Sequence, residues 1–219
     1  MEEENTSTLP ILTPVEIRVL GALIEKDKTT PDYYPMTLNA LTAACNQKTS
    51  RNPVVQYDEE TVVMALNSLK KSGFVSVATG GTSRSVKYKH NFTLVFPLTT
   101  AEVAVLCLLF LRGPLTMGEI NSNSGRLYEF ESLDEVHAVM DKLSQASPAL
   151  VKQLARRHGQ KEARYAHLLG ELIETEEEVL PEEPARKSVN ELEARVWALE
   201  QELAEVKDKL ERLMKELMG

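Results

Sequence analysis

The chain has 219 residues, of which 42% are apolar, 5% aromatic and 26% charged, and its formal net charge is −8. Its longest uninterrupted apolar run, residues 103–111, is nine residues long, about half of the ~18 that a membrane-spanning helix needs, so we expect no membrane span. The first residues include three glutamates and no basic or apolar stretch, so we expect no signal peptide and a cytoplasmic protein. Cys45 and Cys107 stand in apolar helical patterns, and we expect buried free thiols in place of a disulfide.

The excess of negative charge is confined to the last quarter of the chain. Residues 1–170 carry 18 basic and 18 acidic side chains, whereas residues 171–219 carry 7 basic and 15 acidic ones. The acidic balance of the whole chain therefore does not argue against nucleic-acid binding by residues 1–170. Because those residues are neutral overall, any positive surface on them has to be local.

A repeated unit fills the first 170 residues. Residues 12–20 match residues 98–106 at a constant offset of 86. In both segments a Thr stands three positions before a Glu, the pattern of a capping box that satisfies free N–H groups at a helix start. The sequence therefore predicts a first helix of the same kind in each copy.

Two further helices follow in each copy. Residues 35–38 align with residues 114–117, and each segment holds a Thr suited to an N-cap. Residues 60–69 then align with residues 134–143, with apolar side chains at helical spacing. The same three helices are predicted twice, in the same order.

A β-hairpin is expected after each third helix. In the first copy, residues 74–77 and 86–90 read as strands around a tight turn at the glycines 80–81. In the second copy the strands are expected at residues 150–155 and 165–168. Three helices followed by a hairpin is the plan of a winged helix, a helix-turn-helix with a β-ribbon attached.

We predict a mainly α protein of the α+β class, with two tandem winged-helix domains followed by a C-terminal coiled-coil helix. The expected boundaries are a disordered N-terminus at 1–10, winged-helix domains at 11–96 and 97–170, an acidic linker at 171–187 and the coiled-coil helix at 188–218.

Several segments within residues 10–170 resemble those of a known bacterial family. They are residues 18–26, 30–35, 38–41, 45–51 and 111–114. On these segments the chain resembles the YceH-like family, and the resemblance implies two winged-helix domains in tandem but no reaction. The chain departs from the family pattern at Asn121 and Asn123, where relatives tend to place arginines, and Arg126 alone remains.

A heptad pattern occupies the C-terminus. Apolar side chains recur alternately three and four positions apart, nine times in a row, which is typical of a coiled coil whose seam needs a partner helix. Val at the first two a positions and mostly Leu at d favour two strands. We predict a parallel homodimer, with an antiparallel dimer or packing on the body of the same chain as alternatives. The predicted dimerisation residues are Val189, Leu192, Val196, Leu199, Leu203, Val206, Leu210, Leu213 and Leu217.

The third helix of each copy begins with carboxylates, at residues 58–60 and 134–135. A helix N-terminus attracts such groups and DNA phosphates repel them, so we expect contact with DNA through the wings and the turn between helices. Such contact gives salt-dependent and weakly sequence-specific binding. The alternative is that these cations are merely solvated. The candidate nucleic-acid-binding residues are Lys48, Arg51, Arg84, Lys87, Lys89, Arg156, Arg157, Lys161 and Arg164.

The sequence offers no catalytic or metal-binding motif. His90, His137, His158 and His167 have no close metal spacing with Cys or carboxylates, and His137, beside apolar residues in a third helix, is expected to be structural. The glycines 80–81 lack the Lys-Ser/Thr of a phosphate loop. We therefore expect no metal, no cofactor and no enzyme.

Two functions fit these observations. The first is a dimeric, DNA-associated regulator in which the coil joins two modest basic surfaces and raises their effective concentration. The second is a protein-interaction adaptor that binds through its acidic third helices and tail. Segregation and condensation protein B, another acidic tandem winged-helix dimer, is an analogy of fold alone for this second class.

Overall fold

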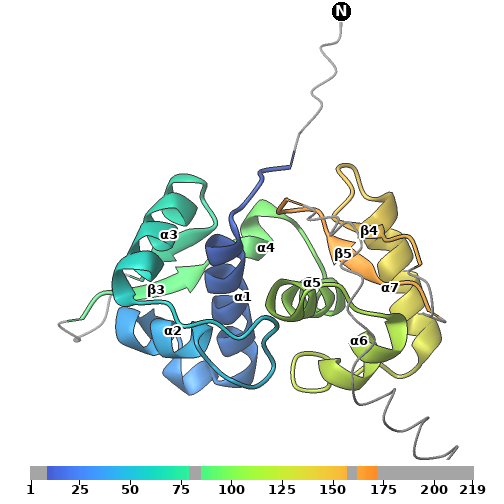
Figure 1. The fold of residues 1–219 in the computed structure, drawn as a ribbon, viewed down its shortest axis with the longest axis horizontal. Helices are drawn as coiled ribbons and strands as arrows, with labels where there is room; N and C mark the ends of the chain where they lie inside the picture. Colours follow the sequence, from blue (N-terminus) through green and yellow to red (C-terminus); the bar gives the residue numbers. More distant parts are fainter. Residues whose placement is uncertain (1–8, 79–84, 157–161, 172–219) are drawn as a thin grey trace, which may run out of the picture. The chain divides into compact units, whose positions relative to one another are not determined.

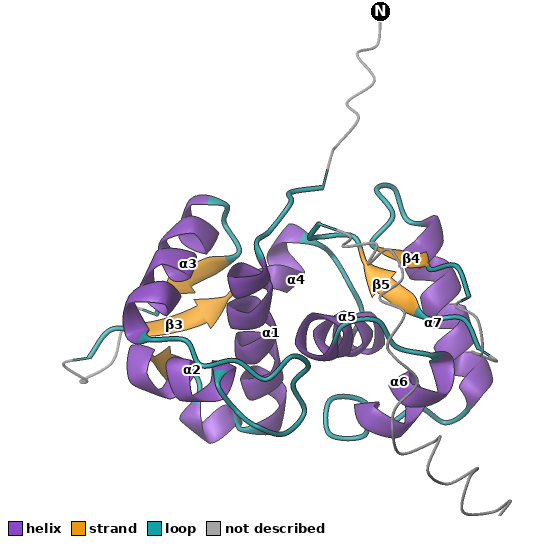
Figure 2. Ribbon diagram, viewed as in Figure 1, coloured by secondary structure: helices purple, strands orange, loops and turns teal. Residues whose placement is uncertain are grey.

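The computed structural model describes residues 9–78, 85–156 and 162–171, all of which belong to one compact unit of the chain. Over these ranges the protein has a mixed α+β fold that is mainly helical (Figures 1 and 2). No helix in the described ranges is both long enough and apolar enough to span a bilayer.

Some predicted features lie outside the described residues. They are the N-terminal segment up to residue 8, the turn at residues 80–81, Arg84, Arg157, His158, Lys161, the acidic linker from residue 172 onward and the coiled coil with its nine heptad residues from Val189 to Leu217.

The first copy of the repeat has the predicted three helices and hairpin. The helices are α1 (Pro14–Thr29), α2 (Leu38–Cys45) and α3 (Glu59–Lys71), and the hairpin consists of β2 (Val75–Val77) and β3 (Lys87–His90). In α2 and α3 one face enters the core and the polar positions stay at the surface, whereas α1 is buried all round from Glu16 to Ile24. A 3₁₀ turn, η1 (Pro31–Tyr33), lies between α1 and α2.

The second copy repeats this order. Its helices are α5 (Thr100–Arg112), α6 (Met117–Ser124) and α7 (Leu133–Gln145), followed by β4 (Val151–Gln153) and β5 (Tyr165–His167). A short helix between the copies, α4 (Phe92–Val95), has no equivalent among the predicted elements.

Capping boxes begin the first helix of each copy, as the sequence predicts. The side chain of Thr13 accepts a hydrogen bond from the N–H of Glu16, whose carboxylate accepts the N–H of Thr13 at 2.7 Å. Thr99 and Glu102 make the same pair of bonds, again with a 2.7 Å return bond. Each box satisfies N–H groups that have no partner inside the helix.

A third strand, which the sequence analysis did not predict, joins the first hairpin. β1 (Met36–Thr37) pairs antiparallel with β3, so that the sheet order is β1-β3-β2 and Met36 lies opposite Tyr88. In the second copy, Leu115 and Tyr165 form an antiparallel bridge. Because Met36 aligns with Leu115 in the repeat, both copies close their hairpin with the same backbone contact.

The two copies share one hydrophobic core. Helix α1 packs against α5, and the approach is close at Gly21, where an added Cβ would lie 3.0 Å from side-chain atoms of Phe110 and Leu111. The buried thiol of Cys107, the residue aligned with Gly21, donates to the Gly21 carbonyl at 3.5 Å. Both predicted buried thiols, Cys45 and Cys107, are free and buried.

Aromatic side chains extend this core from one copy to the other. Phe92 of α4 packs edge-on against Phe110 of α5 with ring centroids 5.7 Å apart, and Phe110 packs edge-on against His167 of β5 at 4.9 Å. Nδ1 of His167 is buried and has no hydrogen-bond partner among the described residues. Burial lowers the pKa of His167 to about 4, so the ring is neutral at pH 7.

Candidate nucleic-acid interface

The central strand of the first hairpin carries two of the predicted cations. Tyr88 and His90 alternate with Lys87 and Lys89 along β3. The side chain of His90 points toward helix α1, because its Nε2 lies 3.6 Å from Asp27 Oδ2. Successive side chains of a strand point to opposite faces, so Lys87 and Lys89 face away from this contact. Neither lysine forms an ion pair with another described residue, and Lys89 is exposed.

Two more predicted cations are exposed elsewhere. Lys48 lies in the segment Asn46–Tyr57 that joins α2 to α3, here called the α2–α3 loop, and Arg156 follows β4 in the second copy. Neither side chain has an ion-pair partner within the described part of the chain. The exposed cations therefore come from three separate elements.

Arg51 and Arg164 do not fit the predicted role. The side chain of Arg51 is fully buried, and its guanidinium donates to both carboxylate oxygens of Glu25, at 2.6 and 3.0 Å, and to the carbonyl of Ala44. Arg164 donates to both carboxylate oxygens of Glu119, at 2.8 and 3.0 Å. Because the guanidinium of Arg51 is buried and engaged, we correct the prediction for this residue. Arg164 is partly exposed but paired, and we leave it out of the proposed phosphate contacts.

A second buried arginine, missed in the sequence analysis, completes a cluster at the end of α2. Arg18 is 4% exposed and donates to the carbonyl of Cys45 at 3.3 Å and to that of Pro53 at 2.7 Å. Ala44 and Cys45 are the last two residues of α2, whose last turn holds no basic residue. The two arginines therefore satisfy carbonyls that a helix C-terminus leaves without partners. In the sequence, Arg18 stands between the apolar residues Ile17 and Val19 of the first helix, and this pattern could have indicated that it is buried.

The electrostatics of this cluster are set by burial and by the two arginines. Burial would raise the pKa of Glu25, but the hydrogen bonds and charge of Arg51, together with Lys26, hold it below its usual range. Burial and the nearby Arg51 charge lower the pKa of Arg18. Burial also raises the pKa of Cys45 to about 12 despite both arginines, so this thiol is no nucleophile at neutral pH.

The α2–α3 loop is fixed at its base and at its middle. The amide of Asn46 donates to the carbonyl of Tyr57 at 2.7 Å and accepts the Tyr57 N–H at 2.8 Å. Further along, the N–H of Asn52 donates to the carbonyl of Leu111 in α5 at 2.8 Å. Ser50, which accepts a hydrogen bond from Arg112 at 3.0 Å, has a φ of 57°. The loop therefore has one defined conformation that involves both copies of the repeat.

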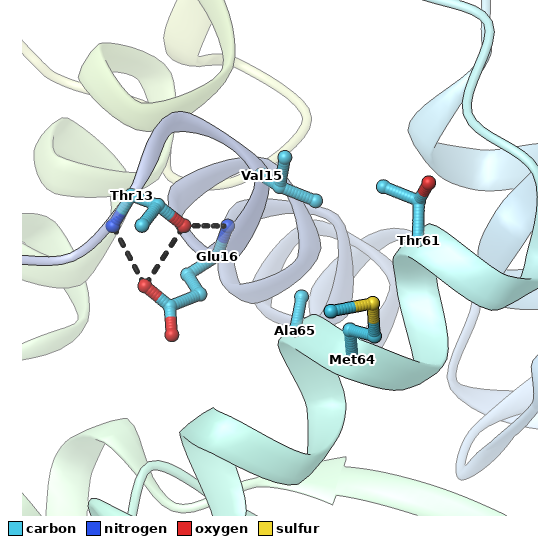
Figure 3. A pocket seen from close by; sticks show the side chains of 6 residues that line it. All are labelled: Thr13, Val15, Glu16, Thr61, Met64 and Ala65. Carbon is cyan, nitrogen blue, oxygen red and sulfur yellow. Dashed lines mark hydrogen bonds between the residues drawn. The ribbon is translucent and has the colours of Figure 1, made fainter.

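The start of α3 is acidic, as predicted. Asp58 is the N-cap and accepts the N–H of Thr61 at 2.8 Å, which lowers the pKa of its carboxyl group. Beside it, α1 and α3 enclose an open pocket of about 270 Å³ next to Met64, which is 68% exposed (Figure 3). The pocket is lined by Thr13, Val15, Glu16, Thr61, Met64 and Ala65. The carboxylate of Glu16 is engaged in the capping box, so this pocket offers mainly apolar contact.

The side chains capable of chemistry are scattered. Within the described ranges, no group of three or more His, Cys, Asp and Glu side chains is placed to hold a metal ion. His137, which the sequence predicts to be structural, is exposed on α7 and does not have the buried position of a structural histidine. It points outward because the buried positions of α7 are Val136, Met140 and Leu143.

The described part of the chain is thus a duplicated three-helix and hairpin unit with exposed cations on separate elements. A family model described as "Protein of unknown function, DUF480" matches residues 12–160. The chain is 48% identical to a UPF0502 protein of Opitutus terrae over 193 residues, 87% of this chain and 84% of the relative. It is 44% identical to a UPF0502 protein of Shewanella halifaxensis over 211 residues, 93% of this chain and 98% of the relative.

These matches confirm the resemblance noted in the sequence. The chain belongs to the DUF480 family of bacterial proteins, also called UPF0502 and YceH-like.

Proposed function

We propose that this protein is a non-enzymatic, tandem winged-helix protein that binds the phosphate backbone of DNA through its wings. The order α1, β1, α2, α3, β2, β3 of the first copy supports the winged-helix assignment. The second copy supports it too, with the Leu115–Tyr165 bridge in the place of the β1–β3 pairing.

The observation that carries the proposal is the pair Lys87 and Lys89 on the outer face of the first wing, without ion-pair partners among the described residues. Exposed lysines bind DNA by neutralising phosphates and releasing condensed counterions. The acidic starts of α3 and α7 oppose insertion of these helices into a major groove. Backbone contact by the wings therefore gives binding with little sequence preference.

Dimerisation is the second part of the proposal. The nine heptad residues from Val189 to Leu217 would pair two chains in a parallel coiled coil. Two bodies on one dimer contact the same duplex, so each weak contact raises the effective concentration of the other.

A salt titration tests the proposal. The affinity of the full chain for random duplex DNA should fall steeply with salt. Lys87→Ala/Lys89→Ala should make the slope of log K against log salt shallower by about 2 for each body of the dimer that contacts the duplex, since each lost phosphate contact removes about 1. Lys70→Ala/Lys71→Ala is the matched control, because these two exposed lysines stand at the far end of α3. Equal slopes for both double variants would contradict the proposal.

A second candidate function is that of a protein-interaction adaptor. It is favoured by α3, where the helix that would enter a major groove presents Asp58, Glu59 and Glu60 and the 68% exposed Met64 beside the small pocket. A wild-type chain that shows no DNA binding at low salt would favour this adaptor over the DNA-binding function.

A further inference from the structure

The first helices of the two copies differ at the positions of the buried ionic cluster. At the offset of 86 that relates the copies, Arg18 of α1 corresponds to Ala104 of α5, and Glu25 corresponds to Leu111. Ala104 and Leu111 are 3% and 2% exposed. The second copy therefore builds the same helix, in the same shared core, with apolar residues at these two positions, and the fold itself does not require the charges.

Buried ion pairs seldom stabilise a fold more than apolar residues of similar volume. In the first copy the cluster instead determines the path of the chain after α2, because Arg51 belongs to the α2–α3 loop and Arg18 donates to the carbonyl of Pro53 in that loop. Ser50 keeps a left-handed backbone conformation, which is uncommon for a residue other than glycine. These contacts preform the loop.

The surface of this loop is suited to anions. No Asp or Glu occurs between Asp32 and Asp58, although the chain has 33 acidic residues. The loop exposes Lys48, Thr49 and Asn52, three side chains that can donate hydrogen bonds. In the second copy, by contrast, the connection between α6 and α7, residues 125–132, contains Glu129 and Glu131.

We propose that the α2–α3 loop is a second, preformed contact for the phosphate backbone of nucleic acid, in which Lys48, Thr49 and Asn52 donate to phosphate oxygens. This inference rests on the proposed function and adds a site to the wings. Phosphate oxygens only accept hydrogen bonds, and Lys, Thr and Asn side chains are among their usual donors in protein–DNA complexes. Arg18 and Arg51 are positioning residues that act through the loop.

The experiment measures binding of the full chain to random duplex DNA over a range of salt. Lys48→Ala should make the slope of log K against log salt shallower by about 1 for each body of the dimer that contacts the duplex. Thr49→Ala/Asn52→Ala should weaken binding about two- to tenfold with an unchanged slope, because neutral hydrogen bonds are lost without counterion effects. Arg126→Ala is the matched control, since this exposed arginine lies in the corresponding connection of the second copy beside Glu129. Thermal melting checks that each variant is folded.

The outcomes separate this inference from the proposed function. If Lys87→Ala/Lys89→Ala makes the slope shallower but Lys48→Ala has the same slope as Arg126→Ala, the loop does not contact phosphate and the proposed contact through the wings is retained. If Lys48→Ala makes the slope shallower and Lys87→Ala/Lys89→Ala does not, the loop contact is retained and the proposed contact through the wings is wrong. A wild-type chain without salt-dependent binding overturns both. Competition by polyglutamate as effective as by DNA of equal charge would overturn the assignment to nucleic acid.

A double-mutant cycle tests the positioning role of Arg51. Arg51→Lys keeps the charge beside Glu25 but cannot reproduce the two-point contact of a guanidinium. Arg51→Lys should make the slope of log K against log salt shallower, toward the slope of Lys48→Ala. The double variant Lys48→Ala/Arg51→Lys should then have the same slope as Lys48→Ala. Additive decreases, or no effect of Arg51→Lys on the slope, would overturn the positioning role.

Discussion

The two copies of the repeat differ most where the chain leaves the second helix. In the second copy, the connection after α6 is closed by neighbours in sequence: Tyr128 donates to Glu135 at 2.7 Å, and the N–H of Glu131 donates to the same carboxylate at 2.9 Å. In the first copy, the α2–α3 loop is held by Arg18 and by the Arg51–Glu25 pair. One scaffold therefore tolerates both a short local closure and a long loop with buried charges, and only the long loop adds a carboxylate-free surface.

Breaking the ion pair of each copy gives the largest expected effect. Arg51→Met removes the two-point contact with Glu25, whose carboxylate then keeps only Lys26 as an ion-pair partner, and it removes the donor to the carbonyl of Ala44. It should lower the free energy of unfolding by about 3–5 kcal/mol. Arg164→Met removes the partly exposed pair with Glu119 and should cost less than about 1 kcal/mol. Urea denaturation of both variants measures the difference, and equal losses would show that the buried pair has no special structural role.

The corresponding histidines of the two hairpins lead to a pH prediction. His90 and His167 lie opposite Val75 and Val151 in the two hairpins. His90 has Asp27 beside it, whereas Nδ1 of His167 has no hydrogen-bond partner within the described ranges of the chain. Burial lowers the pKa of both. An unfolded histidine takes up a proton near pH 6.5 and folded His167 only near about 4, so stability should fall as the pH drops through this window, by about 3 kcal/mol for His167.

His167→Phe, which removes the titrating group and keeps an aromatic ring against Phe110, should flatten this decline in thermal melting between pH 6.5 and 4. The remaining decline in that window then includes His90, whose pKa is lowered in the same direction. His137→Gln is the control, because His137 is exposed on α7. A wild-type profile that is flat in this window, or an unchanged slope in His167→Phe, would contradict the burial of a neutral histidine.

The junction between the copies gives the smallest of the three effects. Gly21→Ala places a Cβ 3.0 Å from side-chain atoms of Phe110 and Leu111, and should destabilise the chain by about 1–3 kcal/mol through overpacking. Gly118→Ala in α6 has room and should be neutral or stabilising by up to about 1 kcal/mol. Differential scanning calorimetry of the two variants measures the change in stability. Stabilisation by Gly21→Ala would show that α1 and α5 are not packed closely here.

Features with local signals were predictable from the sequence. The capping boxes at Thr13 and Thr99 and the acidic start of α3 depend on residues only a few positions apart. Each hairpin joins two strands that follow one another in the chain. Because the unit is repeated, the same local signals occur in both copies and support each prediction a second time. These signals determine most of the helices and strands, because caps and apolar periodicity act within one element.

Features that depend on distant partners were not predictable in this way. Arg51 read as a surface cation, but its partner Glu25 lies 26 positions away, and the partner of Arg164 lies 45 positions away. The pairing of β1 with β3 and the bond from Asn52 to Leu111 likewise join segments far apart in the chain. Only the folded chain brings such groups together, so the set of exposed cations had to be revised.

The most direct test of the account is the salt dependence of DNA binding by the full chain. With Lys48, Lys87 and Lys89 each neutralising a phosphate, the plot of log K against log salt should have a slope of about −2.7 for each body of the dimer that contacts the duplex, at about 0.9 per contact. Fluorescence anisotropy of a labelled random duplex gives this slope. A chain that does not bind the duplex at low salt, or binds it with a flat slope, contradicts the central claim that these lysines hold a phosphate backbone.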